Sequence, residues 1–480
     1  MQAEMEQQNL IDGRWRPAGD GGLLQVRCPS DGLAFTRIPE STNEDVDAAV
    51  RAARKAYESG AWSRLTATDR GRLLLRLAEL TDCNRERLTT IEARDTGKPM
   101  RQARADIEAT VRYFEFYGGA ADKLHGEVIP FSDGYHVQAV REAFGVTAHI
   151  TPWNYPAQMF GRTLAPALAA GNAVVLKPAE DACLAPLALA GLALEAGFPA
   201  GAVNIVCGTG EAAGRHLAAH PGVDFLSFTG SPEVGASVQA AAGRNHVGCT
   251  LELGGKSPQI VFADADLDTV VPVVVNAIVQ NSGQTCSAGS RALIQRSVFD
   301  RVMAMLSSRF ASLTAAPHHE DRDLGALISA AQLKRVEAFF EQADTAPLCR
   351  GDVSGSAPEG GHYFAPALFG PVSPEARIAR EEVFGPVLCC IPFDEEADAV
   401  RLANATEYGL VAGVWTNDGS RQVRMSRALR CGQVFINCFG AGGGIELPFG
   451  GVGKSGHGRE KGFEALRGFT QTKTIIQKFG

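Results

Sequence analysis

The chain reads Val174-Val175-Leu176-Lys177-Pro178-Ala179-Glu180 at the end of an apolar run. The apolar residues predict a β-strand, and the residues after it are typical of the start of a helix with an acidic first turn. To either side, between residues 146 and 255, further strand-like runs alternate with helix-like ones. This alternation favours a parallel sheet with helices on both faces, so the expected fold class is α/β. Ligands of such sheets bind at the carboxyl ends of the strands.

The alternating region divides into short elements. Strands are expected at 146–150, 173–177, 202–207, 225–229 and 250–253, and helices at 159–170, 186–196, 210–219 and 233–242. Before this region, apolar spacing predicts helices at 43–60, with Thr42 as N-cap, and at 69–81, 84–94 and 100–118. After it, a second α/β pattern has strands at 292–294, 387–392, 410–416 and 433–436 and helices at 298–310, 330–342 and 396–403.

Two extended runs, 124–131 and 135–144, flank Ser132-Asp133-Gly134. An Asp-Gly turn between such runs is typical of a β-hairpin. Residues 472–478 also have a strand pattern, with no obvious partner nearby in the sequence. Because an isolated hairpin is only marginally stable, we expect these two elements to pair across subunits.

Composition restricts the function classes. The chain has 480 residues, 45% of them hydrophobic, and a net charge of −8 that is spread along the sequence. Such a surface gives no support to nucleic-acid binding. The 11 cysteines include no C-x-x-C pair and no metal-ligand spacing, which favours a reducing compartment without disulfides or a metal. The acidic N-terminus and an apolar run of only 182–194 predict neither a signal peptide nor a membrane span, so a cytoplasmic protein is expected.

One thiol has an unusual setting. Cys286 lies in Asn281-Ser282-Gly283-Gln284-Thr285-Cys286-Ser287-Ala288-Gly289-Ser290-Arg291, among small and polar residues with glycines on both sides. Structural cysteines occur more often in apolar runs such as 386–391. A thiolate is a strong nucleophile, and glycines let a backbone approach a ligand closely. Taken alone, this stretch fits a nucleophile and a structural cysteine equally well.

Two other motifs supply groups that a nucleophilic thiol would need. Glu252, in Glu252-Leu253-Gly254-Gly255-Lys256, could activate water as a general base. The alternative is a salt bridge between Glu252 and Lys256. Asn154, in the proline-bounded turn 151–156, offers the carboxamide donor of an oxyanion hole.

Three segments suit a nucleotide coenzyme. Lys177 and Glu180 could bind ribose hydroxyls, although a plain helix start explains them at least as well. Gly230 and Ser231 could present backbone N–H groups to a phosphate at a helix N-terminus. The segment 208–213 matches G-x-G-x-x-A but lacks the acidic partner about 20 residues later, so we interpret it as an ordinary turn. In 381–386 an acidic residue stands beside an aromatic one.

Taken together, the motifs identify a resemblance. In order they are TPWNYP, KPAE, FTGSPEVG, ELGGKSP, GQTCSAGSR, EEVFGPV and PFGGVGKSGHGRE. This series strongly resembles the aldehyde dehydrogenase superfamily over nearly the whole chain. The resemblance implies a Rossmann-like coenzyme domain with a five-stranded sheet (1–123 and 145–255), an α/β catalytic domain (256–455) and a β oligomerisation arm (124–144 and 470–480). It also implies a homodimer or homotetramer.

The resemblance assigns roles to particular residues. Cys286 would be the nucleophile, Asn154 and the Cys286 N–H would hold the oxyanion, and Glu252 would activate water to release the carboxylate. The expected coenzyme is NAD, with NADP possible, because a carboxylate at Glu180 would repel a 2′-phosphate. The other coenzyme positions are Trp153, Lys177, Gly230, Ser231, Glu382 and Phe384. Glu460 matches a second acidic position near the active site.

The sequence departs from the common family pattern at Arg162-Thr163, where many members have Trp-Lys. The lysine partner of the second glutamate is therefore missing. An arginine at the position of Arg162 binds the substrate carboxylate in succinate-semialdehyde members, which favours an aldehyde with a distal acidic group, such as a semialdehyde or a carboxylated aryl aldehyde. A surface arginine, or one paired to a nearby glutamate, explains Arg162 equally well. Tyr155 and Phe439 are further candidates for substrate contact, and the glycine-rich stretch 439–444 leaves room for a bulky group. Alternatives are a broad-specificity or aminoaldehyde dehydrogenase, acyl transfer to coenzyme A, and a non-enzymatic structural relative.

Overall fold

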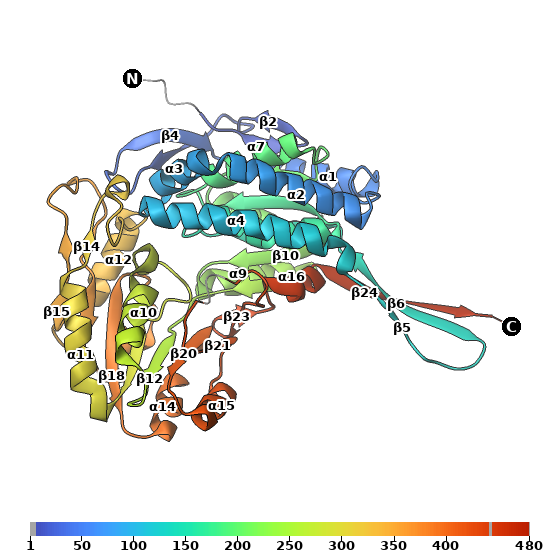
Figure 1. Cartoon of the computed structure of the whole chain (residues 1–480). Coiled ribbons are helices and arrows are strands. Elements are labelled where there is room, and N and C mark those ends of the chain that lie inside the picture. The colour runs from blue at the N-terminus through green and yellow to red at the C-terminus, as the bar shows by residue number, and fades with distance from the viewer. Residues whose placement is uncertain (1–5, 441–443, 480) are drawn as a thin grey trace.

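A computed structural model describes residues 6–440 and 444–479. Two large sheets with their helices form the body, and a long β-arm projects from it, with the C-terminus at the tip (Figure 1). The first sheet is built mainly from the alternating region of the sequence, and the second from the part that follows Cys286. The expected α/β class is confirmed.

The first sheet has eight strands in the order β2-β1-β9-β8-β7-β10-β11-β23. Its strands are β1 (Asn9–Ile11), β2 (Arg14–Arg16), β7 (Val146–Thr151), β8 (Ala173–Pro178), β9 (Val203–Ile205), β10 (Phe225–Thr229), β11 (Gly248–Glu252) and β23 (Gly456–His457). The central five, from β9 to β11, are parallel, as the resemblance implies. Antiparallel strands extend both edges. Strands β7 and β8 are buried along their whole length, which explains their continuous apolar sequence.

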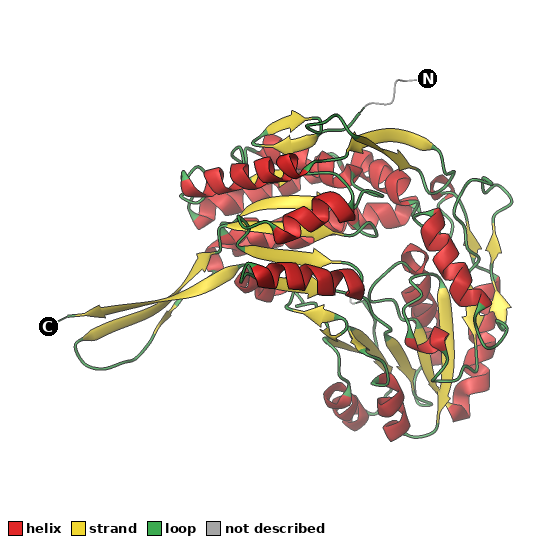
Figure 2. Ribbon diagram, turned by 180° about the vertical axis from the view of Figure 1, so that it is seen from behind, coloured by secondary structure: helices red, strands yellow, loops and turns green. Residues whose placement is uncertain are grey.

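Helices cover both faces of this sheet (Figures 1 and 2). They are α1 (Asn43–Glu58), α2 (Ala67–Cys83), α3 (Arg85–Thr96), α4 (Met100–Ala120), α5 (Pro156–Met159), α6 (Ala165–Ala170), α7 (Leu184–Ala196), α8 (Arg215–Ala219), α9 (Pro232–Arg244) and α16 (Gly462–Gly468), with the 3-10 turn η1 (Ala121–Lys123). Thr42 caps α1 as predicted, because its side chain accepts the N–H of Asp45. The helix predicted at 159–170 is interrupted by a π-helical turn, η2 (Phe160–Leu164), and the one at 210–219 begins with another, η3 (Gly210–Gly214).

The second sheet has seven strands in the order β15-β17-β18-β13-β12-β20-β21. These strands are β12 (Pro258–Val261), β13 (Arg291–Gln295), β15 (Cys349–Arg350), β17 (Ala367–Phe369), β18 (Val387–Phe393), β20 (Val411–Trp415) and β21 (Gln433–Ile436). The accompanying helices are α10 (Leu267–Val279), α11 (Arg296–Ala311), α12 (Ala330–Glu341), α13 (Arg377–Arg380), α14 (Glu396–Ala403) and α15 (Gly419–Ala428), with the 3-10 turns η4 (Gln280–Gly283) and η5 (His318–Glu320). Cys389 and Cys390, in the middle of β18, are fully buried structural cysteines, as their apolar setting indicates.

The arm corrects one expectation. It is a three-stranded sheet of β5 (Glu127–Val128), β6 (Tyr135–Ala143) and β24 (Thr470–Lys478), in the order β24-β6-β5. We expected the hairpin and the tail strand to pair across subunits, but β24 pairs with β6 of the same chain, from Thr470 opposite Ala143 to Lys478 opposite Tyr135. Strands β6 and β24 are far apart in the sequence, so no local pattern identifies them as partners. They meet because α16 returns the chain to the base of the arm just before β24 begins.

Three smaller pairs of strands complete the structure. They are β3 (Leu23–Arg27) with β4 (Ala34–Pro39), β14 (Thr314–Ala315) with β16 (Asp352–Val353), and β19 (Tyr408–Gly409) with β22 (Val452–Gly453). Among the helices within residues 6–440 and 444–479, none combines the length and apolar character that crossing a membrane requires.

Candidate active site

The first sheet gathers four of the predicted site residues along one edge. Asn154 follows β7, Lys177 is the second-to-last residue of β8, Gly230 follows β10, and Glu252 is the last residue of β11. Because these strands are parallel neighbours, their carboxyl ends lie at the same edge of the sheet. Gly230 and Glu252 are joined directly, since the Gly230 N–H donates to the Glu252 carbonyl oxygen over 3.1 Å.

The thiol of Cys286 reaches this edge on a tight loop. Asn281, Ser282 and Gly283 all have left-handed backbone conformations, with φ of 49°, 55° and 75°. A Cβ on Gly283 would lie 2.2 Å from the carbonyl carbon of Gly385, so this position accepts no side chain without a shift. A Cβ on Gly255 would lie 2.5 Å from the Cys286 carbonyl oxygen. The glycines noted in the sequence therefore bring the Cys286 backbone close to the end of β11.

A cavity of about 260 Å³ lies at this point and is lined by residues from both halves of the chain. Among the residues that line it are Trp153, Asn154, Tyr155, Arg162, Gly230, Ser231, Glu252, Cys286, Glu382 and Phe384. All three residues expected to be catalytic are therefore brought together. Lys177, Glu180 and Phe439 are not part of the lining.

Cys286 packs against apolar side chains, with charged groups around it. The apolar neighbours are the cluster of Leu410, Val411 and Phe449. Burial raises the pKa of the Cys286 thiol to about 11, and the positive charges of Arg162 and Lys461 offset part of that rise. Burial therefore disfavours the thiolate, and the two cations favour it.

Glu252 is buried and lies beside Arg162, not Lys256. The Glu252 Oε2 lies 3.6 Å from Nη2 of Arg162, and the side chain of Glu252 is 2% exposed. Burial, and then the negative charge of Glu460, raise the pKa of Glu252 well above its usual value, while Arg162 lowers it. The alternative of a salt bridge between Glu252 and Lys256 is not formed, because the Lys256 Nζ is buried without a hydrogen-bond partner.

Arg162 stands between two carboxylates. Its Nε contacts Oε2 of Glu460, its Nη2 faces Glu252, and its guanidinium carbon lies 4.5 Å from the centre of the Phe449 ring. The residue lies in the π-helical turn η2 and is 8% exposed. A π-turn re-aims the side chains of a helix, and such turns are frequent at functional sites.

The turn that carries Asn154 is held from below by a buried lysine. Lys98 Nζ donates to the Asn154 carbonyl oxygen over 2.9 Å and pairs with Glu92 and Asp106. On the other side, the Asn154 Nδ2 donates to the carbonyl oxygen of Gln284 over 3.0 Å. Burial lowers the pKa of Lys98, but the two carboxylates outweigh it and raise that pKa above its ordinary value. Sequence reasoning missed Lys98, since a lone lysine before a proline carries no signal of burial.

The expected coenzyme residues form a wall of the same cavity. Ser231 caps α9 by accepting the N–H of Val234 over 3.3 Å. The N-terminus of α9 lies at the cavity, since Ser231, Pro232 and Glu233 all line it. Trp153 and Phe384 meet edge to face, with ring centres 5.4 Å apart. Glu382 accepts the N–H of Gly255 over 2.9 Å, and burial raises its pKa to about 7.

Lys177 and Glu180 lie further along the sheet edge. Lys177 Nζ donates to Glu180 Oε2 over 2.6 Å, and Glu180 Oε1 accepts the Gly210 N–H over 3.2 Å. The turn that we interpreted as ordinary, 208–213, therefore contributes a backbone contact to this acidic residue. Lys177 lies near the carboxyl end of β8, and Glu180 follows that end by two residues.

The residues expected to touch the substrate are placed in different ways. Tyr155 lines the cavity, and its hydroxyl lies 2.7 Å from the Thr285 hydroxyl, next to Cys286. Phe439 packs in the apolar cluster that contains Cys286, but outside the cavity lining. Part of the glycine-rich stretch, 441–443, lies outside the described residues. Three further lining residues, Gln332, Arg335 and Tyr408, carry no signal in the sequence that predicts a place in the site.

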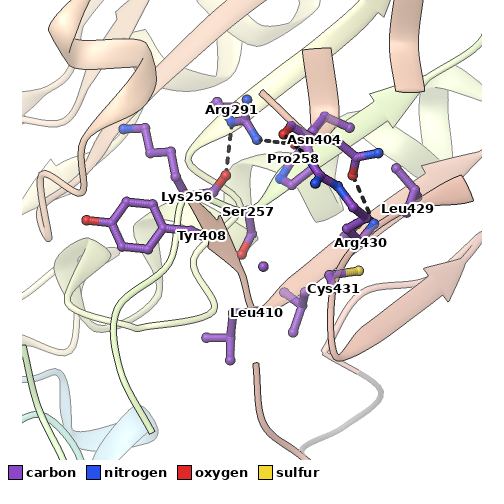
Figure 3. Close-up of a pocket in the computed structure, with 14 residues that line it drawn as sticks. Lys256, Ser257, Pro258, Arg291, Asn404, Tyr408, Leu410, Leu429, Arg430 and Cys431 are labelled. Atoms are coloured by element: carbon purple, nitrogen blue, oxygen red, sulfur yellow. Dashed lines mark hydrogen bonds between the residues drawn. The ribbon is translucent and has the colours of Figure 1, made fainter. Parts of the chain in front are cut away.

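A second pocket, beside Lys256 and Arg291, is a packing gap. Figure 3 shows Arg291 bound to backbone carbonyls, among them that of Lys256 over 2.9 Å. Its volume of about 10 Å³ matches a single water, since about 10–15 Å³ is the least that one water needs. This pocket shares Tyr408 with the cavity at Cys286 but has no room for a ligand.

One group of side chains has the composition of a metal site. Asp47 on α1, His216 on α8 and His220 directly after α8 have ligand atoms within 4.8 Å of one another. The His220 Nδ1 accepts the Gly222 N–H over 2.9 Å, so a neutral ring carries its proton on Nε2, which faces Asp47. Metal binding at Nε2 would require the other tautomer. The geometry therefore fits a hydrogen-bonded cluster.

The chain is similar to known proteins over nearly its whole length. The sequence model of the Aldehyde dehydrogenase family matches residues 15–475. Human retinal dehydrogenase 2 is 39% identical over 476 residues, which cover 98% of this chain and 91% of the human protein. A crystal structure of a Burkholderia cenocepacia chain assigned to the aldehyde dehydrogenases is 57% identical, with a TM-score of 0.97 and coverage of 98% of this chain and 100% of that one.

A second similar structure contains a coenzyme. It is the betaine aldehyde dehydrogenase of Staphylococcus aureus in complex with NAD+, which is 34% identical with a TM-score of 0.95 and covers 98% of this chain and 94% of its own. Sequence model, relatives and structures agree over nearly the full length. The chain belongs to the aldehyde dehydrogenase family, whose members are oxidoreductases that act on aldehydes.

Proposed function

We propose that this protein oxidises an aldehyde to the carboxylate through a covalent bond to Cys286. The thiolate adds to the aldehyde carbonyl carbon, loss of hydride leaves a thioester, and water then cleaves the C–S bond to release the acid. The convergence of Cys286, Glu252 and Asn154 on one cavity carries this proposal. The same convergence argues against a purely structural relative, and the presence of a base argues for hydrolysis over acyl transfer to coenzyme A.

Each of the three residues has a defined task. Asn154 and the Cys286 backbone N–H hold the oxyanion, and Asn154 can do so because Lys98 fixes its turn. Glu252 removes a proton from the attacking water. It is suited to this task because it is buried and its pKa is raised, so the carboxylate is a stronger base than one in solution.

NAD, when bound, supplies the hydride acceptor. The residues fit such a coenzyme: α9 offers a helix N-terminus capped by Ser231, and Trp153 and Phe384 offer aromatic faces beside the thiol. The Lys177–Glu180 pair offers a donor and an acceptor for ribose hydroxyls. Since Glu180 would repel a 2′-phosphate, we propose a preference for NAD over NADP. The NAD+ complex of the similar betaine aldehyde dehydrogenase supports this choice.

For the substrate we propose an aldehyde with a distal acidic group. Arg162 lines the cavity, and its closest contacts with Glu252 and Glu460 are made by Nη2 and Nε, so Nη1 is the nitrogen that we assign to the substrate. A charged hydrogen bond from Nη1 would contribute about 1.5–3 kcal/mol. The pairing of Arg162 with two carboxylates favours a second candidate function. In this candidate Glu252 and Glu460 neutralise the charge of Arg162, and the enzyme oxidises uncharged aldehydes with broad specificity.

A paired-substrate assay distinguishes the two. An aldehyde with a terminal carboxylate is compared with its primary amide, which matches it in size, on the wild type and on Arg162→Met. If Nη1 binds the acid, the wild type prefers the carboxylate and the variant loses that preference by about 10- to 150-fold in kcat/KM. A wild type that prefers the amide supports the broad-specificity candidate. Formation of free acid with NADH tests the reaction itself.

We also propose that the arm joins copies of the chain into a homodimer or homotetramer. Its apolar side chains Val128, Phe131, Ile476 and Phe479 are between 56% and 71% exposed in the single chain. Exposed apolar side chains on a strand edge favour pairing with another chain. Sedimentation of the wild type, compared with a chain that ends before β24, measures this association.

A further inference from the structure

A line of buried polar side chains runs away from Glu460 into the first sheet. The Ser227 hydroxyl lies 3.4 Å from Glu460 Oε1, and the Thr163 hydroxyl lies 2.9 Å from that of Ser227. Thr163 in turn lies 2.7 Å from His149 Nδ1, and Thr147 lies 2.8 Å from His149 Nε2. All five residues are at most 3% exposed.

The number of protons fixes the direction of every bond in this line. His149 is neutral, because burial lowers its pKa to about 3. Each hydroxyl has one proton to donate, and a neutral imidazole has one donor nitrogen and one acceptor. When Ser227 donates to the Glu460 carboxylate, its oxygen must accept from Thr163. Thr163 must then accept from His149 Nδ1–H, and His149 Nε2 must accept from Thr147.

We propose that Ser227, Thr163 and His149 are positioning residues that orient Glu460 and thereby set the charge environment of Glu252. Glu460 is fixed at both oxygens, by Ser227 at Oε1 and by Arg162 at Oε2. The contact between Glu460 and Nε of Arg162 in turn orients the guanidinium, so that Nη2 lies 3.6 Å from Glu252 Oε2. The inference rests on the proposed role of Glu252 as the base, and it adds residues that do not line the cavity.

The inference predicts a direction for the pH dependence. The charged or titratable groups that act on Glu252 and Glu460 are Arg162, Arg459, Lys461, Cys286, Tyr113 and Tyr117. Without the bond from Ser227, the Glu460 carboxylate can rotate away and leave Arg162 to pair with Glu252. Because a closer cation favours the carboxylate, the pKa of Glu252 then falls. The deacylation rate increases with pH, and the midpoint of that increase should move to lower pH. Loss of one hydrogen bond should shift the midpoint by about 0.4–1 pH unit.

Thr163→Val and Ser227→Ala break the line at two points with little change in volume. Thr89→Val is the matched control, since Thr89 lies in α3, outside this line and the cavity lining, and its buried hydroxyl has no hydrogen-bond partner in the described chain. The NADH burst measures acylation, and the steady-state rate over pH measures deacylation. We expect both line variants to keep the burst and to shift the pH midpoint downward, whereas Thr89→Val leaves both unchanged.

A second measurement needs no variant. With ¹⁵N-labelled histidine, the ring nitrogens of His149 in the whole wild-type enzyme report its tautomer. The inferred directions require the proton on Nδ1. A proton on Nε2 would overturn the inference, because Thr163 would then donate to His149, accept from Ser227 and leave Ser227 unable to donate to Glu460. An unshifted pH midpoint in both line variants would also overturn it, whereas a wild type that forms no acid and no NADH from the aldehydes would refute the proposed function itself.

Discussion

Replacing Glu252 by glutamine separates the two halves of the proposed reaction. The side chain keeps its shape but loses its charge and its ability to accept a proton. It is 2% exposed, and in the part of the chain that the structure describes neither oxygen has a hydrogen-bond partner, so the change breaks no hydrogen bond of the fold. Acylation does not require Glu252 once the thiolate has formed, but hydrolysis of the thioester does.

The expected magnitude follows from general-base catalysis, which contributes about 10²–10⁴-fold. Steady-state turnover of Glu252→Gln should fall by about that factor, while the first turnover still releases close to one NADH per subunit. In the wild type, burial and Glu460 raise the pKa of Glu252, so the base gains its charge as pH rises. Deacylation should therefore increase with pH up to that raised pKa, and this limb should vanish in the variant.

Stopped-flow absorbance of NADH measures both phases in a single trace. A burst followed by slow turnover supports the assignment. Loss of the burst in parallel with the steady state would mean that Glu252 also generates the thiolate, and the reasoning that assigns it to hydrolysis would be refuted. Unchanged turnover and an unchanged pH profile would show that another group is the base.

Three further changes have defined outcomes. Cys286→Ala should abolish NADH formation and leave coenzyme binding, measured by fluorescence titration, at the wild-type level; residual turnover near wild type would exclude Cys286 as nucleophile. Glu180→Gln should narrow the preference for NAD over NADP in kcat/KM by roughly 10-fold or more, the equivalent of a charged hydrogen bond, and an unaltered ratio would place the selectivity elsewhere. Gly283→Ala should destabilise the fold by about 1–3 kcal/mol in chemical denaturation, because φ is 75° and a Cβ would meet Gly385 at 2.2 Å. Gly243→Ala is the control, since its Cβ meets nothing within 4 Å.

Local patterns in the sequence were sufficient for much of the fold. Helix α1 begins where Thr42 predicts, and the strands β7, β8 and β10 lie within a residue of their predicted ends. These elements have strong periodicity or long apolar runs, which depend on neighbouring residues alone. The resemblance implied one shared site for Cys286, Glu252 and Asn154, and in the structure all three line one cavity.

Contacts between distant segments were not accessible in the same way. The pairing of β24 with β6 joins residues far apart in the chain, and no local pattern encodes it. For Arg162 the sequence left a substrate contact and a pairing with a glutamate equally open, and only the fold shows that both Glu460 and Glu252 lie against it. Lys98 resembles any surface lysine in sequence, and only the fold shows that it is buried beneath Asn154.

The covalent bond to Cys286 is the central claim, and it can be measured directly. The wild type and Glu252→Gln are mixed with NAD and an aldehyde, quenched in acid during turnover, digested and mapped by mass spectrometry. The account predicts that the peptide containing Cys286 gains the mass of the acyl group, with higher occupancy in Glu252→Gln than in the wild type. Cys286 that stays unmodified in both proteins while acid is produced, or an acyl group found on another residue, would contradict it.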